Sequence, residues 1–144
     1  MALISILNGP NLNLLGQREP EIYGHDTLDD AKRLCSGRAA AIGHEIFFAQ
    51  SNAEHVLIDW IHEARVRSVA IVINPGAYSH TSIAIRDALA AFDGPIAEVH
   101  ITNIHARESF RHHSHVSAVA DMVICGCGIA GYGFAVEAVA AANR

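Results

Sequence analysis

Short apolar runs alternate with helix-like segments along the whole chain, and this alternation constrains the fold more than any other feature. The run Val69-Ala70-Ile71-Val72-Ile73 is apolar on both faces, as expected for a buried parallel strand. The same reasoning predicts five strands, over residues 2–8, 44–50, 68–74, 96–101 and 122–125. Helices are predicted between them, over residues 27–42, 51–66, 82–92, 114–120 and 131–143.

Five strands joined by helical crossovers indicate an α/β fold with a parallel sheet covered on both faces. The expected architecture is a flavodoxin-like three-layer sandwich with strand order 2-1-3-4-5. The chain has 144 residues and no linker, repeat or low-complexity tract, so residues 1–144 are predicted to form a single domain. Thr27 is expected to cap the first long helix, and Ser51 or Asn52 the second.

The composition argues against several classes of partner. The net charge is -5 and Lys32 is the only lysine, so no basic surface for nucleic acid is expected. No apolar run approaches the roughly 20 residues of a membrane span, and the amino terminus lacks the basic region of a signal peptide. Three cysteines favour free thiols in a reducing cytoplasm. Charged residues are only 17% of the chain, which suggests that other subunits cover part of its surface.

A long polar segment, residues 8–24, follows the first strand. It contains three Asn, three Gly and two Pro, together with Arg18 and Tyr23. Connections between strands and helices usually need only two to six residues, and longer ones are often functional. Because this segment starts at the carboxyl end of a strand, where open α/β sheets bind ligands, it is predicted to be an active-site lid.

Two further polar clusters follow the third and fourth strands. The first contains Asn74 and His80, although Asn74 could simply form a turn before Pro75 and His80 could cap a helix. The second contains Glu98 and His100, whose side chains point to the same side of a strand, so that the carboxylate can orient the imidazole. In the order 2-1-3-4-5, all three clusters meet at one crevice.

Two other motifs are weaker. His112, His113 and His115 suggest a metal site, but adjacent histidines project differently and no partner at ligand spacing completes a zinc set. The glycines around Cys127 and Tyr132 do not form a Gly-x-Gly-x-x-Gly motif, so packing of the last helix is the preferred interpretation. No metal and no cofactor are expected.

A cofactor-free site of this composition can carry out proton chemistry. Tyrosine, with an ordinary pKa of about 10, is a poor base at neutral pH, but neighbouring guanidinium groups favour its phenolate. Arg18, Arg107 and Arg111 could supply that charge near Tyr23. A phenolate can then remove a proton next to a carbonyl.

The remaining groups can complete an elimination. Asn11, directly or through water, can hydrogen-bond an enolate oxygen, and His100 oriented by Glu98 can protonate a departing hydroxyl. The residues therefore favour dehydration of a small anionic hydroxy-ketone.

Long ordered motifs extend over essentially the whole chain. They are Asn8-Gly-Pro-Asn-Leu-Asn-Leu-Leu-Gly16, Arg18-Glu-Pro20, Ile22-Tyr-Gly24, Asn74-Pro-Gly-Ala-Tyr-Ser-His-Thr-Ser82, Glu98-Val-His-Ile101, Asn103-Ile-His-Ala-Arg107 and Phe110-Arg-His-His-Ser114. Together these motifs resemble type II 3-dehydroquinate dehydratase. The resemblance implies a shikimate-pathway enzyme that converts 3-dehydroquinate to 3-dehydroshikimate and water by anti elimination through an enolate. It also implies a dodecamer built from trimers.

The resemblance assigns roles residue by residue. Tyr23 matches the base and His100 the acid, Arg18 matches a lid arginine that aids the base, and Asn11 matches the residue that stabilises the enolate. The residues that would bind substrate are Asn74, His80, Asp87, Ile101, Thr102 and Arg111. Ile101 and Thr102 would act with Asn74 on the substrate carboxylate through their backbone, and Asp87 could come from a neighbouring subunit. Glu98 would support His100, and Arg107 would support Tyr23.

Departures from the family pattern are small: Thr102 where Ser is usual, Ser109 at a position expected to face solvent, and Cys127 where Phe is expected. The unrelated type I enzymes need a lysine that forms a Schiff base, and Lys32 lies among charged helical residues. Two rival classes stay open: a non-catalytic flavodoxin-like binding module and a metal-dependent hydrolase that uses the histidine cluster.

Overall fold

The computed structural model describes residues 2–142, and five strands in it form one parallel sheet. The strands are β1 (Ala2–Asn8), β2 (His44–Gln50), β3 (Ala70–Asn74), β4 (Ile96–His100) and β5 (Met122–Cys125). Their order is β2-β1-β3-β4-β5, and every neighbouring pair is parallel. The predicted flavodoxin-like architecture is therefore confirmed.

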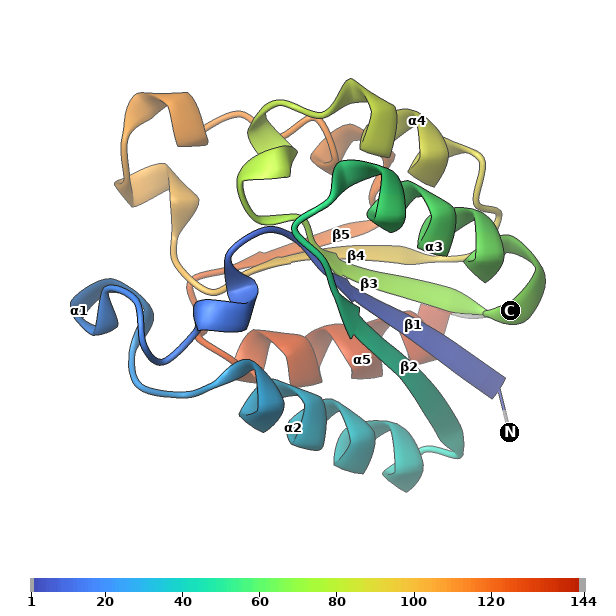
Figure 1. Ribbon diagram of the computed structural model, residues 1–144. Coiled ribbons are helices and arrows are strands. Elements are labelled where there is room, and N and C mark those ends of the chain that lie inside the picture. The colour runs from blue at the N-terminus through green and yellow to red at the C-terminus, as the bar shows by residue number, and fades with distance from the viewer. Residues whose placement is uncertain (1, 143–144) are drawn as a thin grey trace.

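Helices cover both faces of this sheet, as Figure 1 shows. α2 (Leu28–Ala41) and α5 (Ala130–Ala142) lie on one face, and α3 (Glu54–Arg67) and α4 (Ile83–Ala90) lie on the other. The predicted end of the last helix, Asn143, lies outside the described residues. A one-turn helix, α1 (Pro20–Tyr23), projects from the carboxyl ends of the strands.

Short 3-10 helices occur in the connections that follow β1, β3 and β4. They are η1 (Leu12–Leu14), η2 (Gly76–His80), η3 (Ile104–Ala106), η4 (Ser109–Arg111) and η5 (Ser117–Val119). The helix expected over residues 114–120 is thus a single turn, η5. Both its residue Ser117 and the preceding Ser114 donate hydrogen bonds to Glu98, which favours a compact polar turn over a regular helix there.

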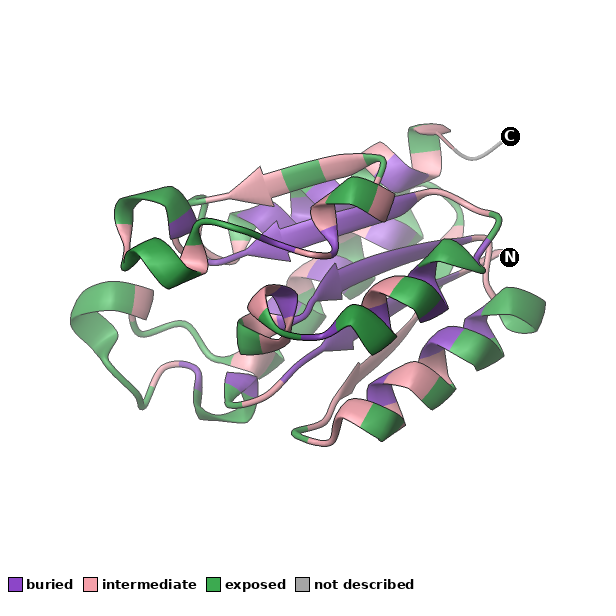
Figure 2. Ribbon diagram, turned by 90° about the horizontal axis from the view of Figure 1, so that it is seen from above, coloured by how far each residue is buried: buried purple, intermediate pink, exposed green. Residues whose placement is uncertain are grey.

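The core has two halves because the central strands bury both faces. Val72 of β3 packs with α2 and α5, whereas its neighbours Ile71 and Ile73 pack with α3 and α4. All three side chains are completely buried. Each such side chain contributes about 1.5–3 kcal/mol of hydrophobic stabilisation, so the sheet interior rigidly supports the residues at its ends. Figure 2 shows the buried central strands and the more exposed edge strand β5.

The N-terminal cap of α2 is the one predicted from the sequence, whereas that of α3 is not. The Thr27 hydroxyl accepts the Asp30 N–H, and the Asp30 carboxylate accepts the Thr27 N–H, which confirms the predicted cap of α2. The predicted side-chain cap of α3 was wrong, because α3 starts after Ala53. The Asn52 side chain instead accepts the backbone N–H of Asn11 at 3.0 Å, and so holds the lid segment.

The turns after β1 and β3 pack closely against each other. Gly9 donates its N–H to the carbonyl of Asn74 at 2.8 Å, and a Cβ on Gly9 would come within 2.3 Å of the Pro75 carbonyl oxygen. Gly76 has a φ of +59° and faces Pro10. Glycine is thus required where the connections of neighbouring strands diverge, and this divergence opens the crevice that holds the site.

None of the helices in the described part of the chain is both long and apolar enough to cross a membrane.

Candidate active site

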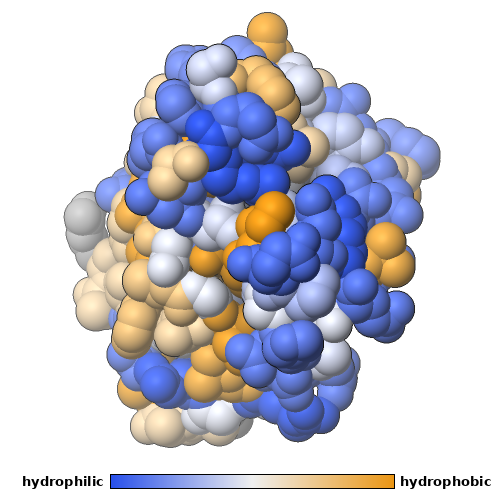
Figure 3. Space-filling model, turned by 90° about the vertical axis from the view of Figure 1, so that its left-hand side faces the viewer, coloured by the Kyte–Doolittle hydropathy of each residue, from blue (hydrophilic) through white to orange (hydrophobic). Residues whose placement is uncertain are grey.

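A pocket of about 170 Å³ lies at the carboxyl ends of β1, β3 and β4. Its walls come from the lid segment, from η2, and from the loop after β4. The lining residues are Pro10, Asn11, Leu12, Leu15, Arg18, Tyr23, Asn74, Gly76, Ala77, His80, His100, Ile101, Thr102, Ile104, Arg107 and Arg111. Figure 3 shows this face, where hydrophilic side chains predominate around a strip of hydrophobic ones. All predicted site residues line the pocket except Glu98 and Asp87.

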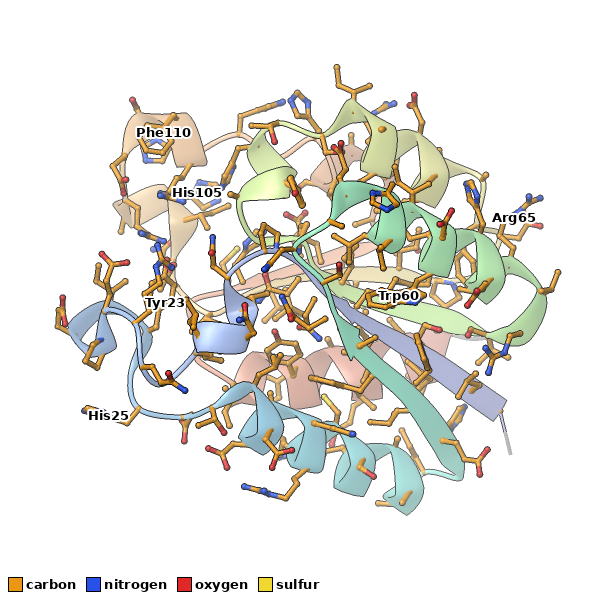
Figure 4. All side chains as sticks on the ribbon, in the orientation of Figure 1. Tyr23, His25, Trp60, Arg65, His105 and Phe110 are labelled. Atoms are coloured by element: carbon orange, nitrogen blue, oxygen red, sulfur yellow. The ribbon has the colours of Figure 1, made fainter. Side chains whose placement is uncertain are left out.

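Two guanidinium groups flank the ring of Tyr23. Arg107 donates a hydrogen bond from Nη1 to the Tyr23 hydroxyl at 2.8 Å, and its Cζ lies 5.2 Å from the ring centroid. The Cζ of Arg18 lies 5.3 Å from the same centroid, and Arg18 also pairs with Glu19 at 3.2 Å. Figure 4 labels Tyr23 beside the loop that carries His105 and Phe110. The phenol oxygen is therefore in direct contact with positive charge inside the pocket.

Glu98 is a completely buried carboxylate behind His100. Its Oε2 accepts hydrogen bonds from His100 Nε2 at 2.5 Å and from Ser114 Oγ at 2.7 Å, and its Oε1 accepts one from Ser117 Oγ at 2.5 Å. Burial alone would raise the pKa of Glu98, but the hydrogen bonds from His100, Ser117 and Ser114 outweigh it and hold that pKa below its ordinary value. Glu98 is thus an anion that fixes the His100 ring.

His80 stacks beside His100, with ring centroids 6.4 Å apart and an angle of 19° between the planes. Its Nδ1 lies 2.8 Å from the carbonyl oxygen of His113, which identifies Nδ1 as a donor. Burial lowers the pKa of His80, and positive charge at His100 and Arg111 lowers it further, although the bond to His113 and the charge of Glu98 act in the opposite direction. His80 is therefore favoured as a neutral imidazole. It does not cap α4, because that cap is Ser82.

Asn74 has both of its amide atoms in hydrogen bonds. Its Oδ1 accepts the N–H of Gly76 at 3.2 Å, and its Nδ2 donates to the hydroxyl of Tyr132 at 3.0 Å. The first bond forms the turn that the sequence left open as an alternative, yet the residue also lines the pocket. Asn74 therefore forms the turn before Gly76 and also contributes to the wall of the pocket.

The backbone after β4 turns its N–H groups away from β5. The carbonyl of His100 accepts the N–H of Gly126 at 3.3 Å, and that of Ile101 accepts the N–H of Gly128 at 3.0 Å. In a trans peptide the N–H points opposite to the carbonyl of the same plane. The N–H groups of Ile101 and Thr102 therefore point away from β5, on the side of β3 and the pocket.

Asn11 sits at the base of the lid in a left-handed conformation with φ of +68°. Its N–H is held by Asn52, and the buried side chains of Leu12 and Leu15 anchor the chain that follows. Arg111, the third arginine predicted near Tyr23, lines the pocket but bonds to Glu108 at 3.2 Å.

Two residues singled out from the sequence lie elsewhere. Asp87 is on the exposed side of α4, where it pairs with Arg86 at 3.4 Å, and it is not part of this pocket. Lys32 is exposed on α2 and is also outside the pocket.

His112, His113 and His115 contact neighbouring protein groups. His112 Nε2 lies 2.8 Å from the Arg107 carbonyl oxygen, and the rings of His113 and His115 meet edge to face at 4.9 Å. Within residues 2–142, no group of three or more His, Cys, Asp or Glu side chains is arranged to hold a metal ion.

The sequence assigned no role in the site to three polar residues that support it, namely Ser114, Ser117 and Tyr132. A buried carboxylate on a strand signals that donors must exist nearby, but the pattern does not say which hydroxyls supply them. Two of the residues that depart from the family pattern are exposed. Ser109 faces solvent, as predicted, and Cys127 is exposed as well.

Comparison with known proteins agrees with this geometry. Residues 2–140 match the family described as dehydroquinase class II. A protein named 3-dehydroquinate dehydratase 2 from Agrobacterium fabrum is 66% identical over 137 residues, 95% of this chain and 93% of that protein. The 3-dehydroquinate dehydratase of Streptomyces avermitilis is 67% identical over 141 residues, 97% of this chain and 89% of that protein.

Solved structures extend the match to three dimensions. The type II dehydroquinase from Propionibacterium acnes superposes with a TM-score of 0.94 at 45% identity, and the match covers 98% of this chain and 97% of the other. A 3-dehydroquinate dehydratase-like protein from Bifidobacterium longum gives a TM-score of 0.73 at 29% identity, with coverage of 98% and 97%. Family match, sequence identity and fold agree, and the chain belongs to the class II dehydroquinase family.

Proposed function

We propose that this chain dehydrates 3-dehydroquinate to 3-dehydroshikimate in the shikimate pathway, by anti elimination through an enolate and without a cofactor. The observation that carries the proposal is that one pocket holds an arginine-bound tyrosine, Tyr23, and a glutamate-bound histidine, His100. These two side chains provide a base and an acid for the two halves of the elimination. Relatives with 66% and 67% identity carry the name of that activity.

Tyr23 is the base. The positive charge of Arg107, 2.8 Å from the phenol oxygen, stabilises the phenolate, and Arg18 adds a second positive charge beside the ring. The phenolate takes a proton from the carbon next to the substrate ketone, and the electron pair moves onto the ketone oxygen to form an enolate. Asn11, directly or through an ordered water, donates a hydrogen bond to that oxygen.

His100 is the acid. Its Nε2 is held by Glu98, so Nδ1 is the nitrogen that can protonate the departing hydroxyl. When the enolate collapses, the carbon–oxygen bond breaks and the hydroxyl leaves as water with the proton of His100. The anionic Glu98 stabilises the positive ring before transfer and keeps it oriented, as the carboxylate does in a catalytic triad.

The remaining lining residues bind the substrate. Asn74 and the N–H groups of Ile101 and Thr102 converge on the site of the carboxylate, a donor set that requires no cation. His80 and Arg111 contact ring hydroxyls. Thr102 acts through its backbone here, so its difference from the usual Ser leaves this contact intact.

We further propose a homo-oligomer, a dodecamer built from trimers. Asp87 is exposed on α4, outside the pocket of its own chain, which is consistent with a contact to the site of a neighbouring subunit. Exposed apolar side chains such as Ile83, 59% exposed, and Phe134, 47% exposed, offer surface for such contacts. Sedimentation measurements test the assembly.

We also propose that residues 1–144 act as one catalytic domain and that the enzyme is cytoplasmic. The supporting observation for location is chemical: Cys35, Cys125 and Cys127 are all unpaired thiols. Unpaired cysteines are usual in a reducing compartment. Fractionation of the source cells tests the location.

The decisive experiment mixes the purified protein with 3-dehydroquinate and follows the ultraviolet absorbance of the conjugated enone product. The proposal requires steady turnover that persists after treatment with a strong chelator. Binding without turnover would instead favour a flavodoxin-like binding module. Activity lost to the chelator and restored by a divalent metal would favour the metal-dependent class.

A further inference from the structure

The tyrosine of the last helix, Tyr132, lies completely buried beneath the pocket. Its ring packs near Phe48, with centroids 6.4 Å apart, and its side chain has no exposed surface. The hydroxyl group reaches the ends of β1 and β3, between the side chains of Asn8 and Asn74. Tyr132 is not among the residues that line the pocket, so it does not touch the substrate itself.

The hydroxyl of Tyr132 forms a continuous chain of hydrogen bonds. It donates to Asn8 Oδ1 at 2.7 Å and accepts from Asn74 Nδ2 at 3.0 Å. Asn8 Nδ2 in turn donates to the carbonyl of Ala49 at 3.0 Å. Because Asn8 and Asn74 are opposite each other in the β1–β3 register, the phenol joins the two strand ends at the crevice.

These bonds decide which way the Asn74 amide faces. Gly76 donates its N–H to Oδ1, and Tyr132 accepts one hydrogen of Nδ2. An amide NH₂ has a second hydrogen, which is directed away from the first. If the amide were flipped, its oxygen would face the hydroxyl of Tyr132 and its NH₂ would face the N–H of Gly76, so one contact would be donor against donor.

We propose that Tyr132 is a positioning residue for substrate binding: its hydroxyl fixes the Asn74 amide so that the second Nδ2 hydrogen points at the substrate carboxylate. This inference rests on the function proposed above for the pocket. The buried hydroxyl suits the task, because burial raises the pKa of Tyr132 well above its ordinary value and it stays a neutral donor and acceptor.

The test compares Tyr132→Phe with wild type in the dehydration assay. The ring volume is kept and only the hydroxyl is lost, so we expect KM to rise about tenfold while kcat changes less than about threefold, as for one lost oriented hydrogen bond. A matched control is Val136→Ala, one turn further along the same helix and fully buried, which loosens α5 but leaves the hydrogen bonds of Asn74 to Tyr132 and Gly76 in place. The control should lose stability but keep KM.

A second readout separates positioning from general loosening. Quinate, the alcohol that corresponds to the ketone substrate, and its uncharged carboxamide are compared as competitive inhibitors. Wild type should bind the carboxylate more tightly than the carboxamide, and Tyr132→Phe should reduce the ratio of the two inhibition constants about tenfold. In an Asn74→Ala background, Tyr132→Phe should raise KM no further, because the group that it positions is absent.

The outcomes are distinguishable. If wild type does not dehydrate 3-dehydroquinate, the proposed function fails first. If wild type is active and Tyr132→Phe keeps both KM and the inhibitor preference, or if Val136→Ala raises KM equally, the positioning role is wrong. Should Tyr132→Phe not fold, Asn8→Ala removes the acceptor of the Tyr132 hydroxyl, and the same inhibitor preference must fall.

Discussion

Arg107 and Tyr23 are 84 positions apart in the chain, yet the guanidinium Nη1 and the phenol oxygen are 2.8 Å apart. One residue comes from the lid after β1 and the other from the loop after β4, so the contact exists only when the lid lies over the pocket. The lid position and the charge beside the proposed base are therefore linked. An open lid would separate the Tyr23 hydroxyl from the Arg107 guanidinium that donates a hydrogen bond to it.

Replacing Tyr23 by Phe should abolish most turnover while leaving binding intact. The ring shape stays the same and only the group that removes the proton is lost, so kcat should fall about 10²- to 10⁴-fold. Turnover is measured by enone absorbance and binding by calorimetry with quinate. Tyr78→Phe is the control, because its hydroxyl bonds to the carbonyl of Asn52 at 2.6 Å outside the pocket. Near-normal turnover of Tyr23→Phe would contradict the assignment.

Ser117→Ala should destabilise the fold at neutral pH by about 2 kcal/mol, the usual cost of removing a hydrogen bond to a buried charge. The pKa of Glu98 is below its ordinary value of 4.5, so its carboxylate stabilises the folded state above that pH, and this contribution is lost as the pH falls through the lowered value. The difference between wild type and Ser117→Ala should therefore be largest at neutral pH and shrink below pH 4.5.

Urea unfolding between pH 3 and pH 7 measures this difference. Ser109→Ala, at an exposed position, is the matched control and should change stability by no more than about 0.5 kcal/mol. A destabilisation by Ser117→Ala that persists undiminished in acid would mean that the hydroxyl acts through packing alone.

The lid should be the first segment that proteases cut. Residues 17–22 are exposed, and they follow the anchored residues Leu12 and Leu15. We expect trypsin to cleave after Arg18 and glutamyl endopeptidase after Glu21, and quinate to slow both cuts. Lys32 and Arg33, exposed but within α2, provide the comparison and should be cut later. Equal cleavage rates with and without quinate would argue against closure over the ligand.

Borohydride added together with 3-dehydroquinate should leave the enzyme active, because no imine is formed for it to reduce. The chain has a single lysine, Lys32, which is exposed on α2 and outside the pocket. Mass spectrometry of the treated protein should show an unmodified chain. A covalent adduct on Lys32 would require a different mechanism.

The fold was predictable because each signal was local and repeated. The apolar runs of β1 and β3, which are buried on both faces, are typical of the central strands of a parallel α/β sheet. The cap at Thr27 depends only on residues 27–30, so the local sequence was enough to predict it. The cap of α3 was mispredicted because Asn52 bonds to Asn11, 41 positions away. A contact of that kind depends on the packed tertiary structure, which no local pattern encodes.

The same distinction applies to the site. Strand order brings Tyr23, Asn74 and His100 to one crevice, and the sequence was sufficient to place them there. It did not reveal Ser117 or Tyr132, because serine and tyrosine are ordinary residues on any helix or turn. Their importance arises only from a buried partner: Glu98 for the one, and Asn8 with Asn74 for the other.

The lid has an anchored start and an exposed end. The side chains of Leu12 and Leu15 are buried in the core, whereas residues 17–22 are exposed and contribute almost nothing to the hydrophobic interior. Substitutions among the exposed residues 17–22 are therefore expected to leave the sheet folded. Because this stretch carries Arg18 and leads directly into Tyr23, changes in it alter the proposed base and its charged surroundings rather than the fold.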